Sequence, residues 1–493
     1  MTTETLVDTD FEVVIGLEVH SQLLTRSKMF CSCSTDYASA QPNTHVCPVC
    51  MGMPGVLPVI NRQAVAYTIM TALALHCSIP EYSKFDRKNY PYPDLMKGYQ
   101  ISQYDIPLSS NGYLTIEHNG QNKKIGITRV HLEEDTARLL HHDGYSLVDI
   151  NRSGTPLMEI VSEPDMRDPE EARLYMQKLR EILVYLGVSS GRMEEGSLRC
   201  DANISVRPRG QQALGVKTEI KNMNSFRAVE RALAYEAQRQ MSVLRNGGTI
   251  HQETRGWVET RGVTVSQRSK EEAHDYRYFP EPDLPPLVIS RVWVDELQAQ
   301  LPELPDARRQ RYMSYGLSAQ DANVLTEDKA LGDYFEQVLA VSEGKERKAR
   351  TRAASNLILN DVARLLKASS LSAQESPLSP AAVANLLDLL ENDRITGKQS
   401  KEVLEEAFAS GKMPEEIVKE KGFAPPISDT SALEEIIATV IANNPKIAAD
   451  YRGGKVNAAQ ALIGQVMKQT RGQARADMVR TLLIAKLDEG AVS

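Results

Sequence analysis

A proline-rich segment, Phe279-Pro-Glu-Pro-Asp-Leu-Pro-Pro286, divides the chain into two parts with different patterns. Proline lacks a backbone N–H and fixes φ, so this segment can continue neither a helix nor a central strand. Before it, runs of alternating apolar and polar residues are mixed with amphipathic helical patterns, whereas beyond Val294 the pattern is almost wholly helical. We therefore predict an α+β region followed by all-α regions.

The first alternating run places a carboxylate and an imidazole on the same side of a strand. In residues 11–20, aliphatic side chains occupy one face, and Glu18 and His20 lie two residues apart on the other. This spacing allows both groups to meet one metal ion, although two residues of this kind are also common as ordinary core or surface groups.

Two further runs, 198–206 and 216–221, alternate in the same way, and we expect them to pair as antiparallel strands. Asp201 and Glu219 fall on their polar faces. Further acids end or interrupt the apolar stretches between these strands: Glu133, Glu134, Asp135, Glu159 and Glu163. Several carboxylates on neighbouring strands suit Mg²⁺ beside phosphate groups. The composition is equally compatible with solvated acids at strand ends.

Four cysteines form two tight pairs, Cys31-Ser-Cys33 and Cys47-Pro-Val-Cys50. Four thiolates at this spacing match the tetrahedral preference of a closed, structural zinc site. We therefore predict a zinc-binding insertion over residues 31–50, the alternative being four unrelated cysteines.

Residues 83–100 combine cations, tyrosines and prolines. Arg87 and Lys88 could hold polyphosphate oxygens while Tyr90 and its neighbours contact a base or sugar; an exposed basic loop is the alternative. The chain contains neither G-x-x-x-x-G-K-[ST] nor G-x-G-x-x-G, so a nucleotide site here is neither a P-loop nor a Rossmann turn.

A second break, Lys421-Gly-Phe-Ala-Pro-Pro426, precedes the last amphipathic helices. From Pro445 to Ser493 there are eight Lys or Arg against four acids, a local charge of +4 in a chain whose net charge is −8. We expect this tail to face nucleic-acid phosphates with its cations, among them Lys455, Lys468, Arg471 and Arg475. The alternative is a helical appendage that docks on a protein.

Composition restricts the class of protein. The chain has no apolar run long enough to span a bilayer, and its acidic N-terminus resembles no secretory or organelle signal. A charged fraction of 25% is ordinary for globular chains, which argues against disorder. We expect a soluble, cytoplasmic, multidomain protein with no membrane contact.

Seven ordered strings converge on one family. They are Gly16-Leu-Glu-Val-His20, Pro54-Gly-Val-Leu-Pro58, Lys84-Phe-Asp-Arg-Lys-Asn-Tyr90, His131-Leu-Glu-Glu-Asp135, Asn151-Arg-Ser-Gly-Thr-Pro156, Glu194-Glu-Gly-Ser-Leu-Arg-Cys-Asp-Ala-Asn203 and Asp275-Tyr-Arg-Tyr-Phe-Pro-Glu-Pro282. From about Phe11 to Leu487 the chain resembles the GatB family, a subunit of the glutamyl-tRNA(Gln)/aspartyl-tRNA(Asn) amidotransferases. Some members of that family lack the four cysteines, so zinc is implied here without being required for activity.

The resemblance implies a glutamine-synthetase-like antiparallel-sheet cradle, an all-α helical domain and a small YqeY-like helical tail that binds tRNA. We place them at residues 1–295, 296–421 and 422–493. Such a subunit uses ATP and Mg²⁺ to phosphorylate the side-chain carboxylate of glutamate or aspartate mischarged on tRNA. Ammonia from an amidase (glutaminase) partner then displaces the phosphate, and a small third subunit completes the heterotrimeric GatCAB complex.

By position, the resemblance also implies roles for individual residues. It gives Mg²⁺ ligands at Glu18, His20, Glu134 and Glu159, with Asp201 and Glu219 as further candidates. It gives Lys88 and Tyr90 as contacts to phosphate or substrate. Glu18, His20, Lys88 and Glu134 are therefore the predicted catalytic residues, and Arg87 joins Lys88, Tyr90, Asp201 and Glu219 as nucleotide-binding. Alternation leaves open whether Glu133 or Glu134 faces the metal.

Two rival functions remain open from the sequence. A free-standing ammonia-using ligase for a small carboxylic acid would not need the basic tail. A zinc-bearing tRNA-binding protein without catalysis would not need acids on strand faces. The sequence contains no glycine- and serine-rich amidase signature, so we expect that this chain does not release ammonia itself.

Overall fold

The structure is a computed structural model that describes residues 10–269, 276–341, 347–423, 430–452, 455, 457–470, 474 and 476–489. The chain separates into two compact units, Met1–Pro305 and Asp306–Ser493. The first is α+β and the second is helical, as the two patterns predict. Among the described helices, none has the length and apolar character that crossing a lipid bilayer requires.

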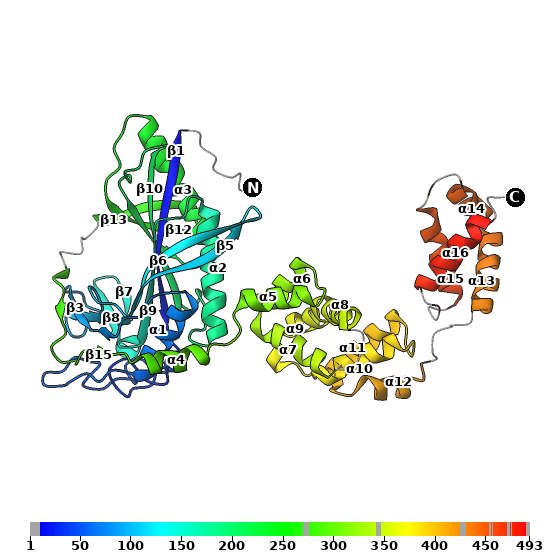
Figure 1. Ribbon diagram of the computed structural model, residues 1–493, viewed down its shortest axis with the longest axis horizontal. Helices are drawn as coiled ribbons and strands as arrows, with labels where there is room; N and C mark the ends of the chain where they lie inside the picture. The colour runs from blue at the N-terminus through cyan, green and yellow to red at the C-terminus, as the bar shows by residue number, and fades with distance from the viewer. Residues whose placement is uncertain are drawn as a thin grey trace. The chain divides into compact units, whose positions relative to one another are not determined.

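An eight-stranded sheet forms the centre of the first unit (Figure 1), in the order β13-β12-β11-β10-β1-β9-β6-β5. Its strands are β1 (Phe11–Gln22), β5 (Ser109–His118), β6 (Gln121–Glu134), β9 (Pro156–Ser162), β10 (Leu198–Pro208), β11 (Thr218–Met223), β12 (Glu253–Val258) and β13 (Val263–Ser269). Neighbours are antiparallel except β11 and β12, which are parallel because a helix crosses over between them. The predicted strands 11–20, 198–206 and 216–221 are present, with the last shifted to Thr218–Met223, and the last two pair antiparallel as predicted.

Helices cover one face of this sheet and leave the other, here called the open face, to polar side chains. The helices on that face are α1 (Arg62–Ala74), α2 (Pro169–Leu186) and α3 (Phe226–Arg245), and α4 (Arg291–Ala299) packs against α1. Asp168 caps α2 by accepting the backbone N–H of Glu170 at 2.7 Å, and Gly187 ends it at φ 68°. The core lies between α1–α3 and the alternate residues of β1 and β10. Because α4 adds Val294 and Leu297 to that core, the first unit extends beyond residue 295.

The proline-rich segment is tied back to the first unit by short edge strands. These belong to two small sheets: β14-β3-β4 (Phe279–Pro280, Asp86–Asn89, Tyr99–Ser102) and β15-β2 (Leu287–Val288, Tyr82–Ser83). A third small sheet, β7-β8 (Arg138–His142, Tyr145–Asp149), is a separate pair of strands. A 3₁₀ turn, η1 (Ile150–Arg152), follows β8. The prolines therefore lie at the ends and edges of strands, where a missing N–H costs no ladder bond.

The second unit is built from helices around two separate hydrophobic cores. One core holds α5 (Pro305–Ser314), α6 (Ala319–Glu327), α7 (Lys329–Ala340), α8 (Arg347–Leu357), η3 (Ile358–Val362), α9 (Ala363–Ala368), η4 (Ala373–Glu375), α10 (Pro380–Glu391), α11 (Gly397–Ser410) and α12 (Pro414–Lys421). The other holds α13 (Thr430–Asn443), α14 (Pro445–Arg452), α15 (Ala458–Gln469) and α16 (Ala476–Glu489). The predicted tail helices are confirmed, with Leu462, Val466 and Leu483 fully buried among them.

Candidate active site

Strand register brings two histidines and a glutamate together on the open face. His20 of β1 lies opposite Glu159 of β9, and Glu159 lies opposite His131 of β6. Because side chains alternate along a strand, Glu133 shares the face of His131. The chain thus carries four ionisable groups on three adjacent strands.

Three of these groups, His20, Glu133 and Glu159, form what we call the acidic cluster. One potential ligand atom from each lies within 4.8 Å of the others. Nε2 of His20 is 3.4 Å from Oε2 of Glu159 and 3.7 Å from Oε1 of Glu133. Nε2 of His131 is 3.5 Å from the same oxygen of Glu159. The cluster has the size of a single-ion site.

The two carboxyl groups of the cluster differ in ionisation. Burial and the neighbouring Glu159 raise the pKa of Glu133 to about 8. Burial also opposes the charge of Glu159, but His131 and hydrogen bonds with Glu133 and His20 hold its pKa well below the usual range. Burial disfavours the His20 imidazolium, yet these acids raise the pKa of His20 to about 9. Near neutral pH Glu133 and His20 thus hold protons, which a cation bound by these groups would displace.

A divalent cation fits these residues. Oε1 of Glu133 is buried and has no hydrogen-bond partner among the described residues, and the donor set is two carboxylates and one imidazole. Mg²⁺ takes one or two carboxylates and keeps other positions for water and phosphate oxygens. His20 and Glu159 are thus brought together as predicted.

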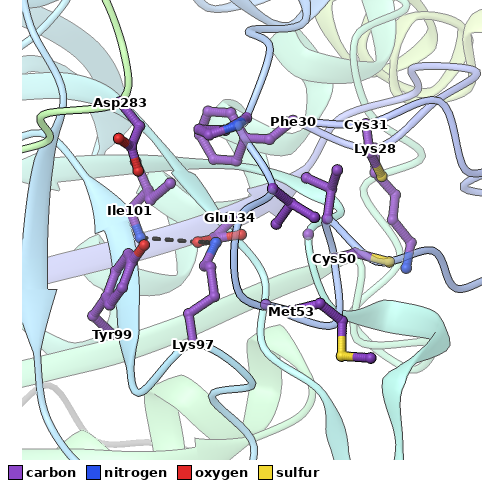
Figure 2. Close-up of a pocket in the computed structure, with 15 residues that line it drawn as sticks. Lys28, Phe30, Cys31, Cys50, Met53, Lys97, Tyr99, Ile101, Glu134 and Asp283 are labelled. Carbon is purple, nitrogen blue, oxygen red and sulfur yellow. Dashed lines mark hydrogen bonds and ion pairs between the residues drawn. The ribbon is translucent and has the colours of Figure 1, made fainter.

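Of the two acids that alternation left open, the structure brings Glu133, and not Glu134, into this cluster. Glu134 points away toward Lys97, with which it forms an ion pair, and accepts the backbone N–H of Ile101 at 3.0 Å (Figure 2). It lines a cavity of about 120 Å³ together with Tyr99 and Cys50.

Glu18, Asp201 and Glu219 form a second acidic row on the same face, beside the cluster. Glu18 lies opposite Asp201, and Nδ2 of Asn203 donates to Oε1 of Glu18 at 2.8 Å. Lys221 donates to Asp201 at 2.6 Å and lies 3.6 Å from Glu219. None of the three belongs to the single-ion group, which among the described residues is His20, Glu133 and Glu159.

Lys88 of β3 faces the acidic cluster, with tyrosines around it. Burial disfavours its charge, but Glu133 and Glu159 raise its pKa, so it stays an ammonium. Nζ lies 4.9 Å from the ring centroid of Tyr276 and 6.0 Å from that of Tyr90. The site therefore presents a fixed cation beside the carboxylates.

Arg87, the adjacent residue, was predicted to bind nucleotide and is paired here with the proline-rich segment. Its guanidinium forms a bidentate pair with Glu281 at 2.7 and 2.8 Å, contacts Asp283 at 3.1 Å and lies 4.2 Å from the ring centroid of Tyr99. With these partners, Arg87 holds the proline-rich segment against β3.

Sequence reasoning missed His131, Tyr276 and Tyr278 as site residues. Tyr278 lies close enough to Glu133 and Glu159 that burial and these acids raise its pKa to about 12. His131 stands two residues before Glu133 in an alternating stretch, a signal that could have placed both on one face.

The four paired cysteines form the second candidate metal group. One sulfur from each lies within 4.8 Å of the others, and the backbone N–H of Cys47 donates to Sγ of Cys50 at 3.1 Å. A hydrogen bond from Cys31 lowers the pKa of Cys50 to about 4. Four converging sulfurs, one held as a thiolate, fit a tetrahedral zinc site.

Of the four tail residues predicted to contact tRNA, Lys455 and Lys468 lie among the residues that the structure describes. Lys455 is exposed and pairs with Asp450 at 3.0 Å, and Lys468 is exposed near the end of α15. Arg471 and Arg475 lie outside the described residues.

A sheet whose open face gathers carboxylates, histidines and a half-buried lysine around a single-ion site defines the catalytic domain of an enzyme. Two family models match the chain: "GatB/GatE catalytic domain" over residues 13–295 and "GatB domain" over residues 333–487. The chain belongs to the GatB family, whose members are subunits of the aspartyl/glutamyl-tRNA(Asn/Gln) amidotransferases.

Three curated relatives are named as this amidotransferase subunit. The protein from Carboxydothermus hydrogenoformans is 56% identical over 484 residues, covering 97% of this chain and 99% of its own. That from Moorella thermoacetica is 56% identical over 483 residues, covering 97% and 100%. That from Dehalococcoides mccartyi is 54% identical over 493 residues, covering 98% and 100%.

Proposed function

We propose that this chain is the transamidating subunit that converts glutamate mischarged on tRNA(Gln), aspartate mischarged on tRNA(Asn), or both, to the amide. The observation that supports this most is the acidic cluster of His20, Glu133 and Glu159 with Lys88 facing it. The relatives' name supports the substrate class, since each is called a subunit of an aspartyl/glutamyl-tRNA amidotransferase.

A side-chain carboxylate is a poor acceptor for ammonia until one of its oxygens becomes a leaving group. The proposed reaction uses ATP: the carboxylate oxygen attacks the γ-phosphorus, and ADP leaves. The nitrogen of ammonia then attacks the acyl carbon, phosphate leaves, and the amide forms with loss of a proton. Mg²⁺, when bound, neutralises phosphate charge.

The position of each residue indicates its role in this reaction. His20, Glu133 and Glu159 would hold the metal, with Glu18, Asp201 and Glu219 beside them. Lys88 remains charged because of the carboxylates facing it, so it can donate to a phosphoryl or carboxylate oxygen. Tyr90 and Tyr276 flank that ammonium and limit its positions.

The relatives' name designates one subunit of an amidotransferase, which indicates a complex of several subunits. We propose that an amidase (glutaminase) partner supplies ammonia, that a small third subunit completes the heterotrimer, and that the complex works in the cytoplasm.

Separation of ammonia release from transamidation gives a direct test. The chain with its small partner subunit should form Gln-tRNA or Asn-tRNA from mischarged tRNA, ATP and ammonium, and should not use glutamine. Phosphate release that depends on mischarged tRNA would be measured together with the amide product. Glutaminase activity in the isolated chain, or ATP cleavage that ignores tRNA, would contradict the proposal and favour a free-standing ligase.

We also propose that Cys31, Cys33, Cys47 and Cys50 hold one structural zinc. Replacing Cys47 and Cys50 with serine should remove the metal and lower the melting temperature more than it lowers the rate per folded molecule, because the cysteine site stabilises a loop apart from the acidic cluster. Metal analysis and thermal unfolding check this. Cys77→Ala, a buried cysteine outside the group, should keep the zinc. Protein made without chelator and found free of zinc would overturn the proposal.

A further inference from the structure

Arg129 of β6 is a cation on the open face that the proposed chemistry leaves unused. Val130 and Leu132 of the same strand are fully buried in the core between the sheet and the helices. Because side chains alternate along a strand, Arg129 lies on the opposite face together with His131. Strand pairing also sets Arg129 opposite Val161 of β9. Arg129 therefore borders the acidic cluster.

The guanidinium of Arg129 forms no ion pair or hydrogen bond within the part of the chain that the structure describes. Its Nε is buried and donates to no described residue. Other arginines near the cluster are paired: Arg199 with Asp135 at 2.9 Å, and Arg87 with Glu281 at 2.7 Å. A buried donor without an acceptor costs free energy. The position of Arg129 therefore favours an anion that comes from outside the chain.

The groups around the acidic cluster feel the charge of Arg129. Burial lowers the pKa of His131 to about 3, and the charge of Arg129 adds to this effect. Burial raises the pKa of Tyr278 to about 12, and Lys88 and Arg129 both act against that rise. The ring of Tyr278 stacks on that of Tyr104, with 4.3 Å between the centroids. Two cations, one from β3 and one from β6, thus lie near the Tyr278 hydroxyl.

These two cations differ in how far the acids of the site engage them. Burial disfavours the charge of Lys88, but Glu133 and Glu159 stabilise it. Arg129 has no acid paired with it among the described residues. A planar guanidinium also matches the geometry of a carboxylate better than an ammonium does. Arg129 is therefore suited to hold an anion that arrives with the substrate.

Two anions must meet in the proposed reaction, the terminal phosphate of ATP and the side-chain carboxylate of the amino acid. The acidic row of Glu18, Asp201 and Glu219 lies on β1, β10 and β11, whereas β6 lies on the far side of β9 (Figure 1). Carboxylates repel another carboxylate, but they suit phosphates that carry Mg²⁺. In phosphoryl transfer the attacking and leaving oxygens lie roughly in line. The attacking carboxylate is therefore expected on the side of β6.

We propose that Arg129 binds the side-chain carboxylate of the mischarged amino acid, an inference that rests on the proposed function. The guanidinium donates to one carboxylate oxygen and leaves the other free to attack the phosphorus. The amide product carries no negative charge, so Arg129 holds it less tightly. Arg129 thereby distinguishes glutamate or aspartate on tRNA from the corresponding amide.

Binding to the complete complex without ATP tests this preference. The unchanged complex should bind glutamyl-tRNA on the order of 10-fold more tightly than glutaminyl-tRNA of the same tRNA; a complex that uses aspartate is tested with the aspartyl and asparaginyl pair. Arg129→Gln should remove most of this preference, and should leave the binding of glutaminyl-tRNA and of ATP with Mg²⁺ unchanged. Arg129→Lys keeps the charge and should keep part of the preference.

Lys124→Gln is the matched control, because it removes an exposed cation from the same strand, one that lies 4.1 Å from the ring centroid of Tyr113. It should keep the whole preference. The inference fails if Arg129→Gln keeps the preference, if Lys124→Gln loses it equally, or if Arg129→Gln weakens only the binding of ATP.

Folding and the proposed function are checked separately. If the melting temperature shows that Arg129→Gln does not fold, Arg129→Lys decides: a reduced preference supports the inference, and an unchanged one contradicts it. An unchanged complex without any preference for glutamyl-tRNA also contradicts it. An unchanged complex that has the preference, but cleaves no ATP when mischarged tRNA is present, contradicts the proposed function instead.

Discussion

Replacing Glu159 with glutamine should lower the tRNA-dependent cleavage of ATP on the order of 10²-fold or more, because the metal neutralises charge that develops in the transition state. Glu159 lies opposite both His20 and His131 in the sheet, and its carboxylate is the group that both imidazoles contact. Glutamine keeps the size of the side chain but removes its negative charge. Amide formation from ammonium should fall in parallel, since both steps use the same site.

The measurement should separate metal binding from folding. Mg²⁺ affinity, followed by the Mg²⁺ dependence of ATP cleavage, should weaken, whereas the melting temperature of the apoprotein should change far less. Glu163→Gln is the matched control, because Glu163 follows the same strand, is exposed and contacts Thr128 at 2.7 Å. An unchanged rate of tRNA-dependent ATP cleavage in Glu159→Gln would remove the acidic cluster from the mechanism.

Alternation predicts the fold best where one strand face is buried and the other is polar. In β1 Val13, Ile15, Leu17 and Val19 alternate on the face toward the helices, so the shared face of Glu18 and His20 follows directly from the sequence. At the end of β6 this contrast disappears, because Glu133 and Glu134 are both buried, with 1% and 6% exposure. Glu133 faces the acidic cluster, and Glu134 faces Lys97 on the other side of the strand. A pattern of apolar and polar residues cannot distinguish two buried acids.

Contacts between segments far apart in the chain also could not be predicted from the sequence. Arg87 and Lys88 are adjacent cations in a loop-like composition, and only the short strand β3 turns them to opposite sides. The partner of Arg87 is Glu281, 194 residues along the chain. The register that brings His131 next to Glu159 likewise depends on pairing with β9, a strand beyond β7 and β8 that local pattern does not specify.

Deleting the chain after Lys421 should weaken binding of mischarged tRNA about 10-fold or more near 0.1 M salt, because the tail supplies phosphate contacts. Its helices α13–α16 have their own hydrophobic core, in which Leu433, Leu462 and Leu483 are fully buried. The deletion therefore removes a separately packed element and should leave the acidic cluster of the first unit intact, with ATP and Mg²⁺ binding unchanged.

Salt dependence tests whether the tail acts through phosphates. Each phosphate neutralised contributes about 0.9 to the slope of log K against log salt on duplex nucleic acid. If Lys455, Lys468, Arg471 and Arg475 each contact one phosphate, the deletion should reduce the slope by about 3 to 4. Lys455→Ala with Lys468→Ala should reduce it by about half of that amount, whereas Lys412→Ala, a lysine of the other helical core that pairs with Glu420 at 2.8 Å, should not. A truncated chain with the full slope and affinity would mean that the tail docks on protein, and that tRNA binds through the sheet or the helices of 306–421.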